Sequence, residues 1–72
     1  MPDFTILVMG FDRRNLCVVV EPVYVARAED QAEAGRLAAE GYAAETGIPV
    51  QPLYAAAGRV ALEKLTQKDV FI

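Results

Sequence analysis

The stretch of sequence that decides the fold runs from Asp30 to Pro49 and reads DQAEAGRLAAEGYAAETGIP. Asp30 has the short carboxylate that accepts hydrogen bonds at the start of a helix, and Glu33 follows three residues later, which is the capping-box pattern. Gly47 suits the left-handed residue that ends a helix, and Pro49 cannot continue one. Together these signals predict a helix over residues 31–46.

Small and apolar residues fall on one side of this predicted helix. They recur at intervals of three and four residues, which is the spacing of one helix face: Ala34, Leu37, Ala38, Gly41 and Tyr42. Because most of these side chains are small, the helix can lie close to a sheet. Leu37 and Tyr42 are expected to be its bulky anchors.

Two segments before the helix have the composition of β-strands. Residues 4–9 (FTILVM) and 16–27 are rich in β-branched and aromatic side chains, and the loop between them, residues 10–15, has the Gly, Asp and Asn of a hairpin. Pro22 has no N–H to donate, so it predicts a bulge or an edge position in the second strand. The first strand is apolar on both faces, which favours a central place in the sheet or a cover over the sheet's second face.

The chain after the helix is open to two interpretations. Residues 50–56 and 59–65 are interpreted as two strands joined by a tight turn at Ala57 and Gly58. The alternative takes residues 55–67 as a second, alanine-rich helix, against which Gly58 counts by about 1 kcal/mol. Whether residues 59–65 are strand or helix therefore stays open.

The predicted order of elements is β-β-α-β-β. This order is typical of an α+β fold, here a single domain over residues 1–72 with one helix packed on one face of a largely antiparallel sheet. The path of the tail, residues 66–72, which ends in three apolar residues, is not determined by the sequence.

The composition excludes most kinds of catalytic and metal site. The 72 residues include no histidine and no serine, and Cys17 is the only cysteine. Serine triads, cysteine–histidine pairs and histidine bases are therefore excluded, and a zinc site lacks its usual ligands. Cys17 has no base beside it in the sequence and is expected to be a small buried apolar residue. We expect neither enzymatic activity nor a cofactor.

Charge and hydropathy limit the kinds of partner. Seven basic and ten acidic residues give a net charge of −3, whereas nucleic-acid backbones require a basic surface, so direct binding of nucleic acid is disfavoured. The longest apolar run, residues 16–20, is far shorter than the roughly 20 residues that a membrane span needs. The chain start lacks the basic region of a secretory signal, and a lone cysteine suits a reducing compartment. We expect a cytoplasmic protein.

The first candidate binding surface is acidic. The charges of residues 27–46 sum to the net charge of the whole chain, and Glu29, Glu33 and Glu40 are the expected contacts with a protein partner. The simpler interpretation is a solvated helix face whose acids lie near the positive end of the helix.

The second candidate surface is the loop between the first two strands. Phe11, Arg13 and Arg14 lie there, and aromatic and arginine side chains dominate protein–protein hot spots. The simpler interpretation is a plain hairpin loop in which Phe11 packs back onto the sheet.

Two segments carry a family resemblance. Residues 23–34 (VYVARAEDQAEA) run from a strand into a capping box, and residues 58–62 (GRVAL) lie in the later hairpin. Both resemble joins in very small phage- and plasmid-encoded proteins, and the plan as a whole is similar to that of anti-CRISPR inhibitors, short chains with a sheet, one helix and no catalytic site. The resemblance implies a protein that covers a surface of a larger nucleic-acid-handling complex in the host cytoplasm, and it carries over no binding residue.

Two functions are therefore expected. The first is a non-enzymatic protein from a phage or mobile element that inhibits or modulates a protein complex, such as a CRISPR effector. The second is a self-associating module that forms a homodimer, because the chain has little core: 12 of its 39 apolar residues are alanine, and a core of this size supplies roughly 3–5 kcal/mol.

Overall fold

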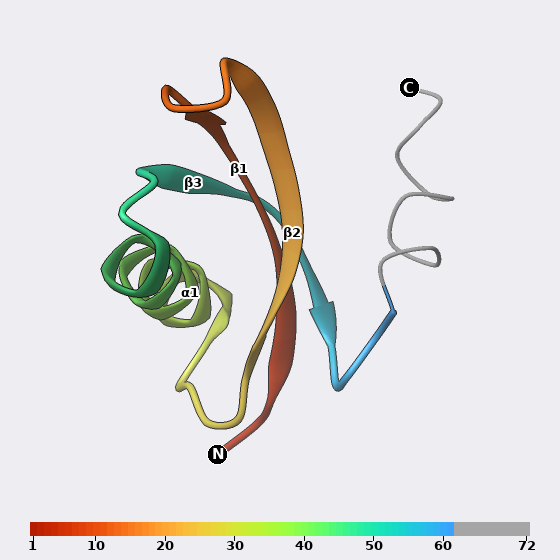
Figure 1. The fold of residues 1–72 in the computed structure, drawn as a ribbon. Coiled ribbons are helices and arrows are strands. Elements are labelled where there is room, and N and C mark those ends of the chain that lie inside the picture. The colour runs from red at the N-terminus through yellow and green to blue at the C-terminus, as the bar shows by residue number, and fades with distance from the viewer. Residues whose placement is uncertain (62–72) are drawn as a thin grey trace.

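The computed structural model describes residues 1–61 of the chain. Its elements are β1 (Phe4–Asp12), β2 (Cys17–Val25), α1 (Gln31–Thr46) and β3 (Val50–Ala57). The three strands form one antiparallel sheet in the order β2-β1-β3, and α1 lies across one face of it (Figure 1). The α+β class, with one helix on one face of an antiparallel sheet, is thereby confirmed.

The strand β1 lies in the middle of the sheet, as its apolar faces predict. It pairs with β2 without any shift of register, and Pro22 stands opposite Leu7 in that ladder. Pro22 therefore takes an edge strand and forms no bulge. The irregularity falls in the other ladder, where Leu7 pairs with Tyr54 and Val8 with Pro52, which leaves Leu53 as an extra residue in β3.

The helix α1 begins and ends at the predicted residues. Oδ1 of Asp30 accepts a hydrogen bond from the N–H of Glu33 at 2.9 Å. The Glu33 carboxylate accepts in turn from the N–H of Glu29 at 2.6 Å, one residue before the usual capping-box donor. At the other end Gly47 has a φ of 76°, and its N–H donates to the carbonyl of Ala43 at 2.9 Å.

The core lies between α1 and the sheet. Its buried members are Ile6, Val8, Val25, Ala28, Ala34 and Ala38. The helix approaches β3 closely, because a Cβ atom on Gly35 would lie 3.3 Å from the ring of Pro52. Tyr42 packs against this core as predicted. Leu37 is 37% exposed and is not among the residues that pack against the core, so its predicted role as an anchor is wrong.

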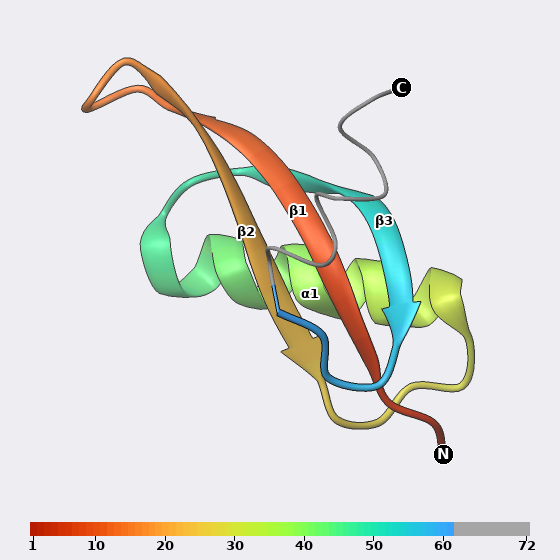
Figure 2. The same cartoon turned by 90° about the vertical axis from the view of Figure 1, so that its right-hand side faces the viewer.

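A short segment after β3 crosses the opposite face of the sheet. Gly58 has the predicted positive φ, at 77°, and its carbonyl accepts a hydrogen bond from the Thr5 hydroxyl at 2.6 Å. The same hydroxyl oxygen accepts from the N–H of Val60 at 2.9 Å, and the Arg59 guanidinium lies 4.1 Å from the ring centroid of Tyr24. The segment thus runs from β3 across β1 to β2 (Figure 2), and it covers part of the sheet's second face.

The predicted fourth strand does not begin where expected. Residues 59–61 are not in a strand, because Thr5 and Tyr24 hold them across the sheet. The alternative helix is wrong at residues 55–57, which belong to β3. Residues 62–65 and the tail 66–72 lie outside the described residues.

Candidate protein-binding site

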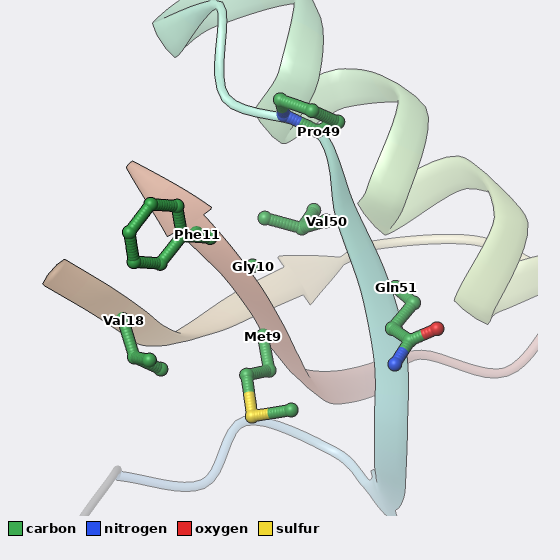
Figure 3. Close-up of a pocket in the computed structure, with 7 residues that line it drawn as sticks. All are labelled: Met9, Gly10, Phe11, Val18, Pro49, Val50 and Gln51. Carbon is green, nitrogen blue, oxygen red and sulfur yellow. The ribbon is translucent and has the colours of Figure 1, made fainter. Parts of the chain in front are cut away.

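A hollow of about 430 Å³ opens at the end of the sheet where β1 and β2 approach their turn (Figure 3). Figure 3 shows Phe11 and Val18 on one side of it and Pro49, Val50 and Gln51 on the other. Most of the lining side chains are apolar. A concave apolar surface of this kind is suited to receive an apolar side chain.

Gly10 explains why the hollow forms at this point. The ladder between β1 and β3 ends with the pair Gly10 and Val50. A Cβ atom on Gly10 would meet the carbonyl oxygen of Pro49 and would lie 2.6 Å from Cγ1 of Val50. Only a residue without a side chain allows β3 to start so close to β1. Beyond this pair β1 continues to Asp12 without β3 beside it, and the step between the strands leaves the hollow.

Two large apolar side chains at the hollow are exposed. Phe11 and Val18 stand opposite each other in the ladder, and they are 47% and 61% exposed. A single exposed apolar side chain is ordinary. An exposed pair beside an apolar hollow indicates an interaction surface.

Asp12 holds the turn that follows in one conformation. Its Oδ1 accepts hydrogen bonds from the N–H groups of Arg14, at 2.9 Å, and Asn15, at 3.3 Å, and its Oδ2 accepts from the Asn15 side-chain amide at 2.7 Å. These bonds, the Asn15 amide foremost, hold the pKa of Asp12 below its ordinary value. The ordered turn presents Arg13 and Arg14 at the tip of the hairpin, where both are exposed.

The residues predicted in the first loop therefore lie together. Phe11 belongs to β1, which runs three residues further than predicted, and Arg13 and Arg14 lie in the turn next to it. The exposure of Phe11 does not fit the simpler interpretation in which its ring packs back onto the sheet. We name Phe11, Arg13, Arg14, Val18 and the hollow beside them the hairpin-end surface.

The predicted acidic residues are engaged by neighbours on the helix. Arg36 lies 3.9 Å from a carboxylate oxygen of Glu33 and 3.2 Å from one of Glu40. Glu33 also accepts the N–H of Glu29. Exposed pairs of this kind contribute about 0.2–0.5 kcal/mol each, and they offset part of the negative charge.

The turn lies beside the end of α1, whereas two of the three predicted acidic residues lie at its start. A second hollow, of about 310 Å³, lies between the turn and Thr46 and Gly47 at the end of α1. Glu29 and Glu33 lie at the start of the same helix, which is 16 residues long, or about 24 Å at 1.5 Å per residue.

Sequence reasoning missed part of the hollow and misplaced Cys17. Met9, Pro49, Val50 and Gln51 come from separate segments, and only the sheet order brings them together. Alternation along β1, which puts Met9 on the same face as Phe11, was the sequence signal that could have predicted the place of Met9.

Cys17 is exposed, so its predicted burial is wrong, because it stands at the beginning of the edge strand and outside the apolar core.

Residues 1–61 lack the features of two other kinds of site. No group of three acidic or cysteine side chains in this part of the chain could hold a metal ion. No helix within it has the length and apolar character needed to cross a membrane.

The chain matches no family model, no curated protein and no solved structure.

Proposed function

We propose that this chain is a non-enzymatic protein-binding module that inhibits or modulates a larger protein complex by covering one of its surfaces. The observation that carries the proposal is the hairpin-end surface. It joins the exposed pair Phe11 and Val18, an apolar hollow, and the guanidinium groups of Arg13 and Arg14. Aromatic and arginine side chains around a pocket are the usual makers of a binding hot spot.

The chemistry of this surface specifies the partner segment that fits it. The hollow of about 430 Å³ has room for one aromatic or branched aliphatic side chain. The arginines at the tip favour a carboxylate close to that anchor, because guanidinium groups form paired hydrogen bonds with carboxylates. The partner segment therefore carries an apolar residue next to an acidic one.

The acidic residues of the helix have a different part in the proposal. Glu29 and Glu40 are exposed, and the chain carries a net charge of −3. The electrostatic field of these negative charges accelerates association with a basic surface more than it strengthens the complex. A nucleic-acid-handling complex in the host cytoplasm, as the resemblance to anti-CRISPR inhibitors implies, offers a basic surface of this kind.

Capture from host lysate with the intact chain as bait tests the proposal. The captured protein is then titrated against the wild type, Phe11→Ala and Leu53→Ala. Leu53 is the matched control, because it is 50% exposed, much as Phe11 is, but lies in β3 away from the hollow. We expect Phe11→Ala to weaken binding at least about tenfold and Leu53→Ala to leave it unchanged.

Equal affinities for the three chains would contradict a role for the hairpin-end surface. Capture of no protein would contradict the proposal as a whole. Charge reversal at Glu29 and Glu40 should slow association and leave dissociation unaltered, and Glu33 is spared because it caps the helix. Association rates that do not respond to these reversals or to salt would remove the acidic residues from the mechanism.

A further inference from the structure

The strand β2 has an open edge. It is nine residues long and pairs with β1 alone, and none of the strands that the structure describes lies on its outer side (Figure 2). An edge strand offers a row of unpaired N–H and C=O groups, to which another extended strand can bind.

Pro22 reveals which backbone groups point outward. In an antiparallel ladder, residues alternate between those that bond to the partner strand and those that face away. Pro22 has no N–H, yet its ladder with β1 continues without a shift, so its nitrogen belongs on the outer side, where a missing donor costs the ladder nothing. Val18 and Val20 have the same parity as Pro22, and their N–H and C=O groups therefore face outward too.

The half of β2 before Glu21 lacks the usual protection of an edge. Proteins block edge strands with charged residues, proline or bulges, and in β2 the charge and the proline come at Glu21 and Pro22. Residues 17–20 (CVVV) are uncharged, and Val18 is 61% exposed. This half also lies on the part of the hairpin that projects beyond α1 (Figures 1 and 2).

We propose that a second copy of the chain covers this edge, with β2 pairing antiparallel to β2 of the other copy about a two-fold axis at Val19. In this register Val18 of each copy stands opposite Val20 of the other, and each such pair exchanges two N–H···O bonds. A register centred on Val20 would place Val18 opposite Pro22 and lose a donor at each end. The two three-stranded sheets then form one continuous six-stranded sheet.

Self-complementarity identifies the occupant as a second copy. The pairing sets β-branched side chains against each other at each of the three positions Val18, Val19 and Val20, which stabilises antiparallel strands. No charged residue of the segment meets a like charge, because Glu21 stands opposite Cys17 of the other copy. The small core gives the chain a reason to associate, since the large apolar side chains buried in the described part are Ile6, Leu7, Val8 and Val25 alone.

The experiment measures the mass of the 72-residue chain in solution by sedimentation equilibrium, with a reductant present so that Cys17 cannot cross-link two copies. The wild type is expected to be a dimer. Val20→Pro removes an outward donor and, like the native Pro22, leaves the ladder with β1 intact, and it should weaken dimerisation at least about tenfold. Val20→Thr is the matched control, because it keeps the β-branched shape and the N–H, and it should dimerise.

Amide exchange identifies the surface. In the dimer the N–H groups of Val18 and Val20 should be protected, and the N–H of Tyr24, which has the same parity but lies beyond Pro22, should exchange freely. A wild type that stays monomeric overturns the proposal, and so does a dimer that Val20→Pro does not weaken. Protection of Val18 and Val20 in a monomer also overturns it, because the chain would then cover its own edge. None of these outcomes depends on the capture experiment, which probes Phe11.

Discussion

Gly10 lies where the start of β3 meets the central strand, and its missing side chain decides how close the two strands come. Gly10→Ala would force a methyl group against the Pro49 carbonyl and Val50. We expect the free energy of unfolding to fall by about 1–3 kcal/mol, measured by urea denaturation. A shift of β3 would also change the hollow, because Val50 and Gln51 line it.

Gly41→Ala is the control for this substitution. A methyl group on Gly41 would meet nothing within 4 Å, and alanine stabilises a helix by about 0.5–1 kcal/mol relative to glycine. The free energy of unfolding should therefore rise. A fall in both variants would contradict the argument from close contact.

A second residue-scale prediction concerns Asp12 and pH. Its pKa in the folded chain is lower than the ordinary value of 3.8, so its contribution to stability is complete above that value and is lost as the pH falls through the lowered pKa. Asn15→Ala removes the largest cause and should raise the pKa of Asp12, followed by NMR of its carboxyl carbon. Arg14→Ala keeps the main-chain bond and should change the pKa less. Equal changes in the two variants would show that charge dominates instead.

At the scale of elements, the cap of α1 makes the first prediction. Asp30→Ala removes the acceptor for the N–H of Glu33 and should lower the free energy of unfolding by about 0.5–2 kcal/mol, measured by thermal denaturation. Asp30→Asn keeps an acceptor and should lose much less. If both variants lost the same amount, charge at the helix start would be responsible rather than the hydrogen bond.

The segment that follows β3 and crosses the sheet, residues 58–60, gives the second prediction at this scale. Thr5→Val leaves the carbonyl of Gly58 and the N–H of Val60 without their partner, and Thr5 is only 2% exposed. We expect a loss of about 1–3 kcal/mol of unfolding free energy. Thr46→Val is the control, because the Thr46 hydroxyl also bonds to a carbonyl and an N–H but is exposed to water. A similar loss in both variants would contradict a special role for the crossing.

These elements differ in how well the sequence predicts them, and the difference follows from distance along the chain. The bounds of α1 could be predicted because Asp30, Glu33 and Gly47 act within a few residues. The hydrogen bond that holds the segment after β3 across the sheet could not be predicted, because its partners Thr5 and Gly58 are 53 residues apart. The candidate site divides in the same way: the loop residue Phe11 was found from its type, whereas the opposite wall of the hollow at Val50 required the sheet order.

At the scale of the whole molecule, the proposed dimer links stability to concentration. A partner that binds the folded chain alone stabilises it by mass action. The melting temperature of the wild type should therefore rise with protein concentration, measured by calorimetry, and at each concentration it should lie above that of Val20→Pro. A wild-type melting temperature that is independent of concentration would contradict the linkage.

The central position of β1 has a consequence for synthesis. β2 can pair with β1 across a four-residue turn soon after both leave the ribosome, whereas β3 emerges only after α1. In the interval, one side of a nascent strand that contains Ile6, Leu7 and Val8 has no neighbour, and such a strand is open to chaperones and to other growing chains. That side closes only when the eight residues of β3 have themselves left the ribosome and paired with β1.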